Sequence, residues 1–127
     1  MVSFLVRLGM GSELKRITAV FYRTQAGNEP VREWLKKLDK HSRQIIGQDI
    51  RTVEFGWPIG MPVCRPLGSG LYEVRSTLRD TIARILFCMH EGDMVLLHGF
   101  VKKTQKTPDD DLALARKRKA EVERADD

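Results

Sequence analysis

The spacing of apolar residues changes several times along the chain, and each change predicts a new element. Residues 17–23 are β-branched and aromatic, as in a strand, and the break at 25–30 ends it. In 31–40, apolar residues recur at i, i+3, i+4 and i+7, which predicts one buried stripe on a helix. A second stripe follows in 42–56, where Gly56 ends the helix. We expect these two helices to form a hairpin that packs on a sheet.

Three strands are predicted in the second half of the chain, at 71–78, 81–90 and 94–103. Only the short connections RD and EGD separate them, which favours antiparallel hairpins. The stretch before them is rich in Pro and Gly and is predicted to be a loop with one short strand at most. This order predicts an α+β fold: a small antiparallel sheet with an N-terminal helix hairpin packed on it and a C-terminal helix.

Capping residues indicate where each helix begins. Asn28, Ser42 and Thr107 are the predicted N-caps, with Pro30 and Pro108 near first helical positions. The three aspartates that follow suit the positive end of the last helix. Further along that helix, the basic run RKRK is followed by acids. We interpret it as a solvated helix face, and a nucleic-acid-binding arm is the alternative.

Composition then narrows the class of partner. The chain has 127 residues, a hydrophobic fraction of 42% and a formal net charge of +5. A basic balance favours a polyanionic partner, such as nucleic acid, an acidic protein or a membrane surface, although ordinary surface lysines are an alternative. No run approaches the roughly 18 apolar residues of a membrane span. The two cysteines and three histidines lack the spacing of metal ligands, so we predict no metal or cofactor. Two cysteines outside a C-x-x-C pair suit a reducing compartment, so we predict a cytoplasmic location.

Charged residues interrupt the predicted strands where a core strand would be apolar. Alternation places Arg75 beside Glu73 on one face of its strand, and Arg84 beside Leu86 on the next strand. On the last strand, the residues expected to share one face are Leu96, His98, Phe100 and Lys102. One concave surface would then be lined by Arg75, Arg84, His98 and Lys102, with Lys103 and Lys106 at its rim.

The stretch 65–106 carries an excess of positive charge. It holds seven basic residues against four acidic ones, and two of those acids belong to the turn EGD. A phosphate group would compensate this excess, so we hypothesise an anion-binding site. The alternative is that Arg75 pairs with Glu73 and that the lysines are plain surface residues.

Three segments together resemble the RelE/ParE superfamily of bacterial toxins, and specifically its phage-derived HigB-like branch. They are GLYEVR (70–75), ARILFCM (83–89) and LLHGFVKKTQKTP (96–108), the last followed by a charged helix. The resemblance runs from about Ile17 onward, so it implies one RelE-like toxin domain over 17–127. It leaves an N-terminal extension, 1–16, which most relatives lack and whose role is unknown.

The resemblance also implies a function. It implies the toxin of a type II toxin–antitoxin system, an endoribonuclease that cleaves mRNA in the ribosomal A site without a metal ion. Its partner would be a helix-turn-helix, HigA-like antitoxin, and it would reach operator DNA only through that antitoxin. The alternatives are a ParE-like toxin that acts on DNA gyrase and a non-enzymatic nucleic-acid-binding phage regulator.

Several basic residues match functional positions of the family, namely Arg75, Arg84 and Lys102–Lys103. RNA supplies its own nucleophile, so the protein must accept the 2′-hydroxyl proton, stabilise a phosphorane-like charge and protonate the leaving oxygen. Arg75 and Arg84 would clamp phosphate oxygens. Histidine exchanges protons near neutral pH, so His98 is a candidate acid or base, and Lys102 would share that task. The residues predicted to bind RNA are Arg65, Lys103 and Lys106.

Overall fold

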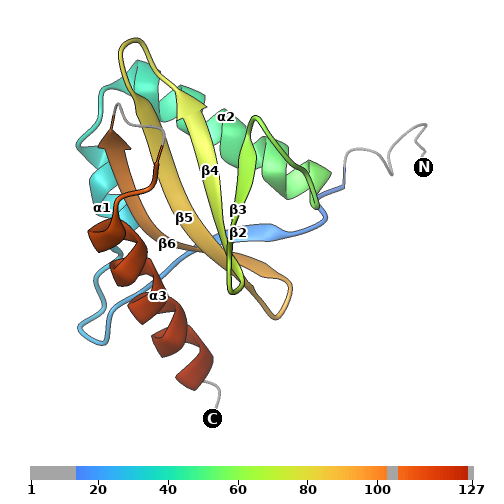
Figure 1. Cartoon of the computed structure of the whole chain (residues 1–127), viewed down its shortest axis with the longest axis vertical. Coiled ribbons are helices and arrows are strands. Elements are labelled where there is room, and N and C mark those ends of the chain that lie inside the picture. The colour runs from blue at the N-terminus through green and yellow to red at the C-terminus, as the bar shows by residue number, and fades with distance from the viewer. Residues whose placement is uncertain (1–13, 103–105, 126–127) are drawn as a thin grey trace.

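The computed structural model of the protein describes residues 14–102 and 106–125. In these ranges the elements run in the order β2 (Thr18–Phe21), α1 (Pro30–Lys36), α2 (Lys40–Gly56), β3 (Cys64–Gly68), β4 (Leu71–Thr77), β5 (Ile82–His90), β6 (Asp93–Lys102) and α3 (Asp109–Arg124), as labelled in Figure 1. Most of the predicted extension 1–16 lies outside the described residues, and so does Lys103.

The strands form a five-stranded sheet in the order β2-β6-β5-β4-β3. Strands β3 to β6 pair antiparallel, which confirms the predicted hairpins, but β2 pairs with β6 in parallel. The sheet is therefore mixed, and it is larger than the small antiparallel sheet that we expected. Strand β2 also precedes α1 and α2, so the helix pair is not N-terminal. The α+β class itself is confirmed.

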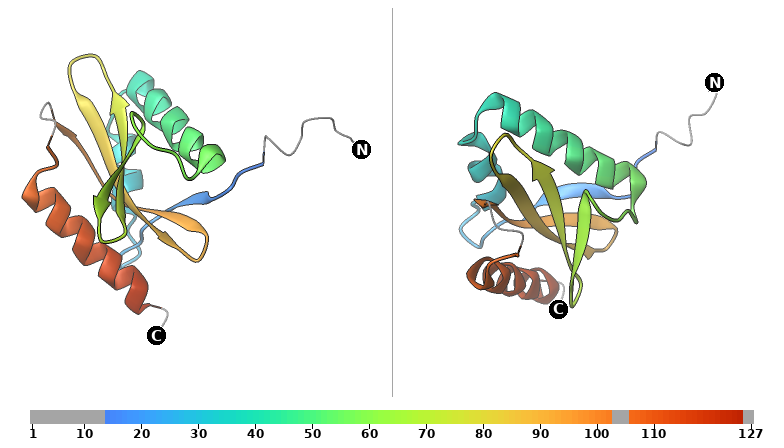
Figure 2. Two further views of the ribbon diagram at one scale, coloured as in Figure 1. Left: turned by 45° about the vertical axis from the view of Figure 1, so that its right-hand side comes forward. Right: turned by 45° about the horizontal axis from the view of Figure 1, so that its top comes forward.

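The two faces of the sheet are covered by different helices. Helices α1 and α2 pack on one face and α3 lies on the other, so the sheet is the middle layer (Figure 2). Under α1 and α2, the buried core includes Val31, Ile46, Val53, Ile85 and Phe87. Under α3, a smaller apolar cluster includes Leu71, Leu86, Cys88, Leu97 and Ala115.

The predicted helix stripes face the core, although α1 ends at Lys36, before the last residue of its predicted stripe. Val31 of α1 is fully buried, and so are Ile46 and Val53 of α2. Trp34 of α1 lies directly against Gly99 of β6, where an added Cβ atom would stand 2.5 Å from Trp34 Cε3. Because a glycine has no Cβ, α1 can approach β6 this closely.

The first two helices begin differently from the prediction. Asn28 belongs to a turn, where its N–H donates to Thr24 Oγ1 at 3.1 Å, and Glu29 occupies the N-cap position of α1 without a side-chain bond. Asp39 caps α2 by accepting a hydrogen bond from the Ser42 N–H at 3.1 Å. Asp39 stands three residues before Ser42, which is the spacing that a side-chain cap requires, so the carboxylate replaces the predicted Ser42 hydroxyl.

The start of α3 also corrects the prediction. Pro108 occupies the N-cap position and provides no side-chain cap, whereas Thr107 was the expected cap. The Thr107 hydroxyl instead donates to Glu73 Oε2 on β4 at 2.6 Å. A buried carboxylate needs a hydrogen-bond donor more than an exposed helix end needs a cap. The Thr107 hydroxyl meets this need, and the contact fixes the start of α3 to the sheet.

Candidate functional site

The strand register brings arginines together on the face under α3. Arg75 on β4 is directly opposite Arg84 on β5, and Glu73 is directly opposite Leu86. Directly opposite residues have Cβ atoms roughly 5 Å apart, so the two arginine side chains are neighbours. Arg65 on β3 is opposite Glu73 and joins the same face. We refer to Arg65, Arg75, Arg84 and Glu73 as the arginine cluster.

Glu73 is the fixed counter-charge of this cluster. Its side chain is fully buried, its Oε2 accepts the hydrogen bond from Thr107, and its Oε1 lies 3.8 Å from Arg75 Nε. The structure thus contains the pairing of Arg75 with Glu73 that is the alternative to an anion site. One carboxylate, however, cannot balance three guanidinium groups, so the pairing leaves positive charge in excess.

Arg84 is buried without hydrogen bonds. Its side chain is 0% exposed, and its Nε, Nη1 and Nη2 atoms have no hydrogen-bond partner in the ranges that the structure describes. The guanidinium lies over the Phe100 ring, 6.0 Å from the centroid. Burial is the largest cause that lowers the pKa of Arg84, and Glu73 opposes the shift. Arg75 and Arg65 lower this pKa further. A buried guanidinium without hydrogen-bond partners is costly, and an anion is one group that would supply them.

A β-bulge in β6 determines which side chains join this face. The pairing with β5 shifts by one residue, and Leu97 is the extra residue on β6. Leu96 therefore packs in the core under α1 and α2, whereas Leu97 and His98 lie under α3. The prediction that Leu96 shares a face with His98 is wrong, because the bulge interrupts the alternation on which it rests.

His98 is held between α3 and the arginine cluster. Its Nε2 lies 2.6 Å from Oδ1 of Asp111, in the first turn of α3, and its side chain is 17% exposed. The imidazole ring stacks on Phe100 with the centroids 5.5 Å apart. Phe100 therefore contacts both His98 and Arg84. A carboxylate bonded to one imidazole nitrogen fixes the orientation of the ring.

The other predicted site residues lie at the margin or outside. Lys102 ends β6 opposite Ile82, on the same face as Arg84, but its side chain is exposed. Lys106 is exposed beside the start of α3, and Arg65 is half-buried. The structure thus brings Arg65, Arg75, Arg84 and His98 together and leaves Lys102 and Lys106 outside the buried group. Lys103 lies outside the described residues.

The family of proteins described as "Phage derived protein Gp49-like (DUF891)" matches this chain over residues 33–120. That range is more than half of the chain and includes the whole arginine cluster. The chain belongs to the Gp49-like family. This phage-derived family is RelE-toxin-like and occurs in toxin–antitoxin systems. No curated protein sequence matches the chain.

Three residues of the candidate site were assigned other roles from the sequence. Thr107 was predicted as a helix cap, Asp111 as a partner of the helix dipole, and Phe100 only as a neighbour on the strand. All three contact the charged residues of the site. Thr107 precedes the N-cap of α3 and Asp111 lies in its first turn, so their position at the start of this helix is the signal that could have identified them.

The two cysteines of the Gp49-like chain are buried free thiols. Burial raises the pKa of Cys64 to about 11 and that of Cys88 to about 11, so both stay protonated and neither is a nucleophile at neutral pH. Within 14–102 and 106–125, no group of three or more His, Cys, Asp or Glu side chains is placed to hold a metal ion. No helix in those ranges is both long enough and apolar enough to cross a membrane.

Proposed function

We propose that this chain is the toxin of a type II toxin–antitoxin system, of the HigB-like branch, and that it cleaves mRNA on the ribosome. Its membership of the Gp49-like family supports the toxin assignment. The observation that carries the cleavage proposal is Arg84, a fully buried guanidinium whose three nitrogens have no hydrogen-bond partner in the described ranges. A group that costs stability in this way, beside other ionisable groups, is typical of a functional site.

The charge of the arginine cluster suits phosphoryl transfer. Three guanidinium groups and one carboxylate leave a net charge of two positive units. An RNA phosphodiester carries one negative charge, and a phosphorane-like transition state carries a second. The cluster would therefore attract the transition state more strongly than the bound substrate, which is the condition for a faster chemical step.

The residues around the cluster supply the remaining roles. Arg75, whose side chain is 10% exposed, would contact a phosphate oxygen directly, and Arg84 would act from beneath it. His98 would accept the 2′-hydroxyl proton, and Asp111 would stabilise the imidazolium. Because Asp111 occupies Nε2, proton exchange would use Nδ1 of His98. Lys102 would lie at the rim of the site.

The proposal includes a partner and a compartment. The antitoxin would be a HigA-like helix-turn-helix protein, and the complex would bind operator DNA through the antitoxin in the cytoplasm. An exposed basic surface favours an electrostatically complementary partner. Co-expression with the product of the neighbouring reading frame, followed by pull-down, tests this part, and failure of that product to bind would count heavily against it.

The burial of the site favours a second candidate function. Arg84 is buried, and His98 is hydrogen-bonded to Asp111. Two of the four proposed catalytic residues therefore do not face a substrate directly in the free protein. A ParE-like toxin that acts on DNA gyrase needs no cleavage chemistry and would tolerate such a covered site. The two candidates differ in which macromolecular synthesis stops first in a cell.

Induced expression of the unpartnered protein distinguishes these candidates. Pulse labelling of protein and DNA synthesis is expected to show that translation stops first, and primer extension on cellular mRNA is expected to reveal new 5′ ends. The Arg75→Ala variant serves as the control without cleavage. If DNA synthesis stops first while mRNA stays intact, the ribonuclease proposal is wrong and the gyrase function replaces it.

A further inference from the structure

Two oppositely charged side chains of the arginine cluster lie buried with unused hydrogen-bonding groups. Glu73 and Arg84 are both 0% exposed. Within the described ranges, Glu73 Oε1 and all three side-chain nitrogens of Arg84 have no hydrogen-bond partner. An acceptor and three donors thus stay unpaired on one face of the sheet, although buried opposite charges are expected to pair with each other. This arrangement requires a further contact that keeps the two groups apart.

The strand register places the two side chains within reach of each other. Glu73 is directly opposite Leu86 and Arg75 is directly opposite Arg84, so Glu73 and Arg84 are diagonal neighbours on β4 and β5. Long side chains can meet across such a diagonal. Burial lowers the pKa of Arg84 and the charge of Glu73 raises it, so the two groups interact although they form no hydrogen bond. Distance therefore does not explain why they are unpaired.

The contact that holds Glu73 comes from the start of α3. The Thr107 hydroxyl donates to Glu73 Oε2 at 2.6 Å, and Thr107 is itself buried. This length is typical of a hydroxyl bonded to an ionised carboxylate, which is one of the stronger hydrogen bonds in proteins. Threonine is branched at Cβ, so few rotamers are open to its hydroxyl. The bond fixes the rotation of the carboxylate, with Oε1 3.8 Å from Arg75 Nε and not bonded to Arg84.

The carboxylate depends on this bond more than the helix does. Further along α3, Arg118 Nη1 donates to the Leu97 carbonyl oxygen at 2.8 Å, and Ala115 is fully buried against the sheet. The helix therefore has other attachments. In the part of the chain that the structure describes, Thr107 is the only hydrogen-bond donor to Glu73. Anchoring of α3 thus does not by itself account for the contact.

We propose that Thr107 is a positioning residue of the arginine cluster: it holds Glu73 away from Arg84, so that the Arg84 guanidinium stays available to a phosphate group. This inference rests on the proposed function and adds to it a residue that contacts neither the substrate nor the reacting atoms. Without the Thr107 hydroxyl, the carboxylate turns toward the unpaired nitrogens of Arg84. The internal ion pair then takes the place of the phosphate, and the cluster binds anions more weakly.

The test compares Thr107→Val, which keeps the shape and removes the hydroxyl, with Thr107→Ser, which keeps the hydroxyl. The probe is inorganic phosphate, titrated into the purified protein and followed by the NMR shifts of backbone amides. Thr107→Val is expected to bind phosphate at least about fivefold more weakly, as for the loss of one hydrogen bond, whereas Thr107→Ser should stay within about twofold of the natural protein. Unchanged affinity in Thr107→Val, or no recovery in Thr107→Ser, would overturn the proposal.

A double-mutant cycle separates positioning from anchoring. If Thr107 acts through the charge of Glu73, Thr107→Val should change phosphate affinity by less than about twofold in the Glu73→Gln background, because no carboxylate is left to pair with Arg84. A residue that only anchors α3 would cause the same loss in both backgrounds. Equal losses in the natural and Glu73→Gln backgrounds would therefore contradict the proposal.

The Nε–H group of Arg84 reports the pairing directly. Its NMR signal in isotope-labelled protein is identified by its absence from the spectrum of Arg84→Met. In Thr107→Val, pairing with Glu73 should move this signal and slow its exchange with water, and Thr107→Ser should restore both properties. A signal that stays unchanged in Thr107→Val would show that the carboxylate has not turned toward Arg84, and the proposal would fail.

Thr52 provides a matched control. Its hydroxyl donates to the Gln48 carbonyl oxygen at 3.0 Å within α2, which lies on the other face of the sheet (Figure 2). Thr52→Val removes one hydroxyl and one hydrogen bond, as Thr107→Val does, but it should leave phosphate affinity within about twofold. A loss equal to that of Thr107→Val would show that the effect is not specific to the arginine cluster.

The remaining outcomes are kept distinct. If Thr107→Val does not fold, Thr107→Cys takes its place, because a thiol is a weaker donor than a hydroxyl, and unchanged phosphate affinity in that variant would overturn the proposal. Phosphate binding needs neither a ribosome nor cleavage. Intact mRNA together with the expected phosphate results would refute the cleavage function and leave the role of Thr107 in place. Cleaved mRNA with unchanged phosphate affinity in Thr107→Val would refute the role of Thr107 alone.

Discussion

The two faces of the sheet are built on different physical principles. The face under α1 and α2 is apolar, with Ile85 and Phe87 fully buried and Phe87 stacked on Tyr72 at 5.4 Å between ring centroids. The face under α3 buries Glu73 and Arg84 and is joined to α3 by hydrogen bonds. Alternate residues of β4 and β5 supply both faces, so each strand contributes to packing on one side and to charge on the other.

This difference separates the residues that hold the fold from those to which we assign the proposed chemistry. Burial of apolar surface stabilises the folded state by about 25 cal/mol per Å² and needs no hydrogen-bond partner. A buried charge, in contrast, needs an opposite charge or hydrogen bonds. The α3 face meets this need only in part, because the nitrogens of Arg84 are left without partners in the described ranges. Substitutions on the first face should therefore affect mainly stability, whereas on the second face the loss of Arg84 should affect mainly activity.

The largest loss of stability is expected from Phe87→Ala. The ring also meets Trp57 at 5.8 Å between centroids, and its removal leaves a cavity in the apolar core. The free energy of unfolding should fall by about 3–5 kcal/mol, as for buried aromatic truncations. Urea denaturation measures this directly. A loss below about 1 kcal/mol would mean that the face under α1 and α2 is not the main source of stability.

A smaller but substantial loss is expected from Glu73→Ala, because this variant leaves Arg75 and Arg84 without their carboxylate. Breaking a buried ion pair from one side costs about 3 kcal/mol. Glu73→Gln keeps the shape and an acceptor for Thr107, so it isolates the effect of the charge. Inorganic phosphate should raise the melting temperature of Glu73→Gln more than that of the natural protein. Equal shifts would show that the arginine cluster does not bind anions.

The smallest of these stability effects is expected from Tyr22→Phe, which removes the hydrogen bond to Glu121 and should cost about 1 kcal/mol at neutral pH. Burial and that hydrogen bond raise the pKa of Tyr22. A raised pKa in the folded state means that this stabilisation is complete below about pH 10 and is lost as the pH rises further. Urea denaturation at pH 7 and pH 11 should therefore show a difference between natural protein and variant that shrinks at the higher pH. A difference that grows with pH would contradict the assigned hydrogen bond.

Local patterns predicted the elements well, because each one depends on residues close together in the sequence. The short turns RD and EGD predicted the antiparallel hairpins, and the stripes at Val31 and Ile46 predicted the buried helix faces. The parallel pairing of β2 with β6 could not be predicted in this way, because the two strands lie far apart in the sequence and no short turn connects them. The prediction of a small antiparallel sheet was wrong for that reason.

The placement of the arginines on the sheet was predicted from the sequence, but their environment was not. Alternation correctly placed Arg75 and Arg84 on one face. The bulge at Leu97 has no signature in the alternation, so Leu96 was assigned to the wrong face. The full burial of Arg84 could not be foreseen either, because it arises where α3 and the strands come together.

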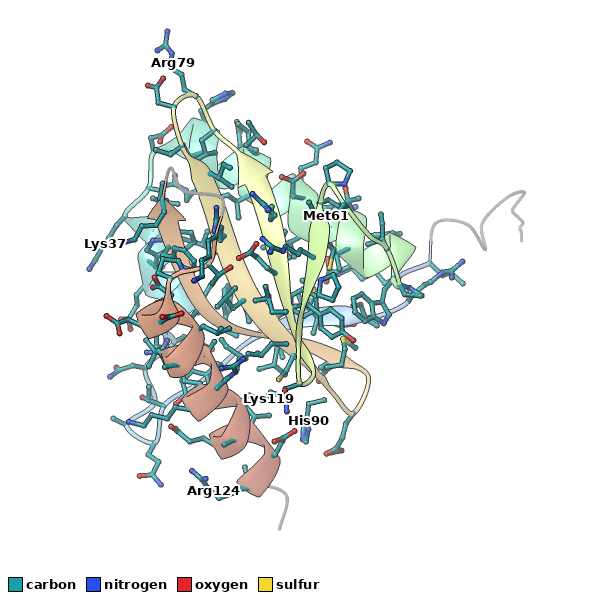
Figure 3. The ribbon with its side chains drawn as sticks, viewed as in Figure 1. Lys37, Met61, Arg79, His90, Lys119 and Arg124 are labelled. Carbon is teal, nitrogen blue, oxygen red and sulfur yellow. The ribbon has the colours of Figure 1, made fainter. Side chains whose placement is uncertain are left out.

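The most direct test of the account is Arg84→Met, assayed for both thermal melting and ribosome-dependent cleavage of a defined mRNA. Methionine has a similar volume and carries no charge, so the melting temperature should stay the same or rise, since replacing a buried charge with an apolar group is neutral or stabilising. Cleavage should fall at least about 100-fold, because the transition state loses a charged donor. Arg79→Met, at the exposed tip of the β4–β5 hairpin (Figure 3), is the matched control and should keep both properties. Full cleavage by Arg84→Met, or a clearly lower melting temperature, would contradict the claim that Arg84 is retained for function.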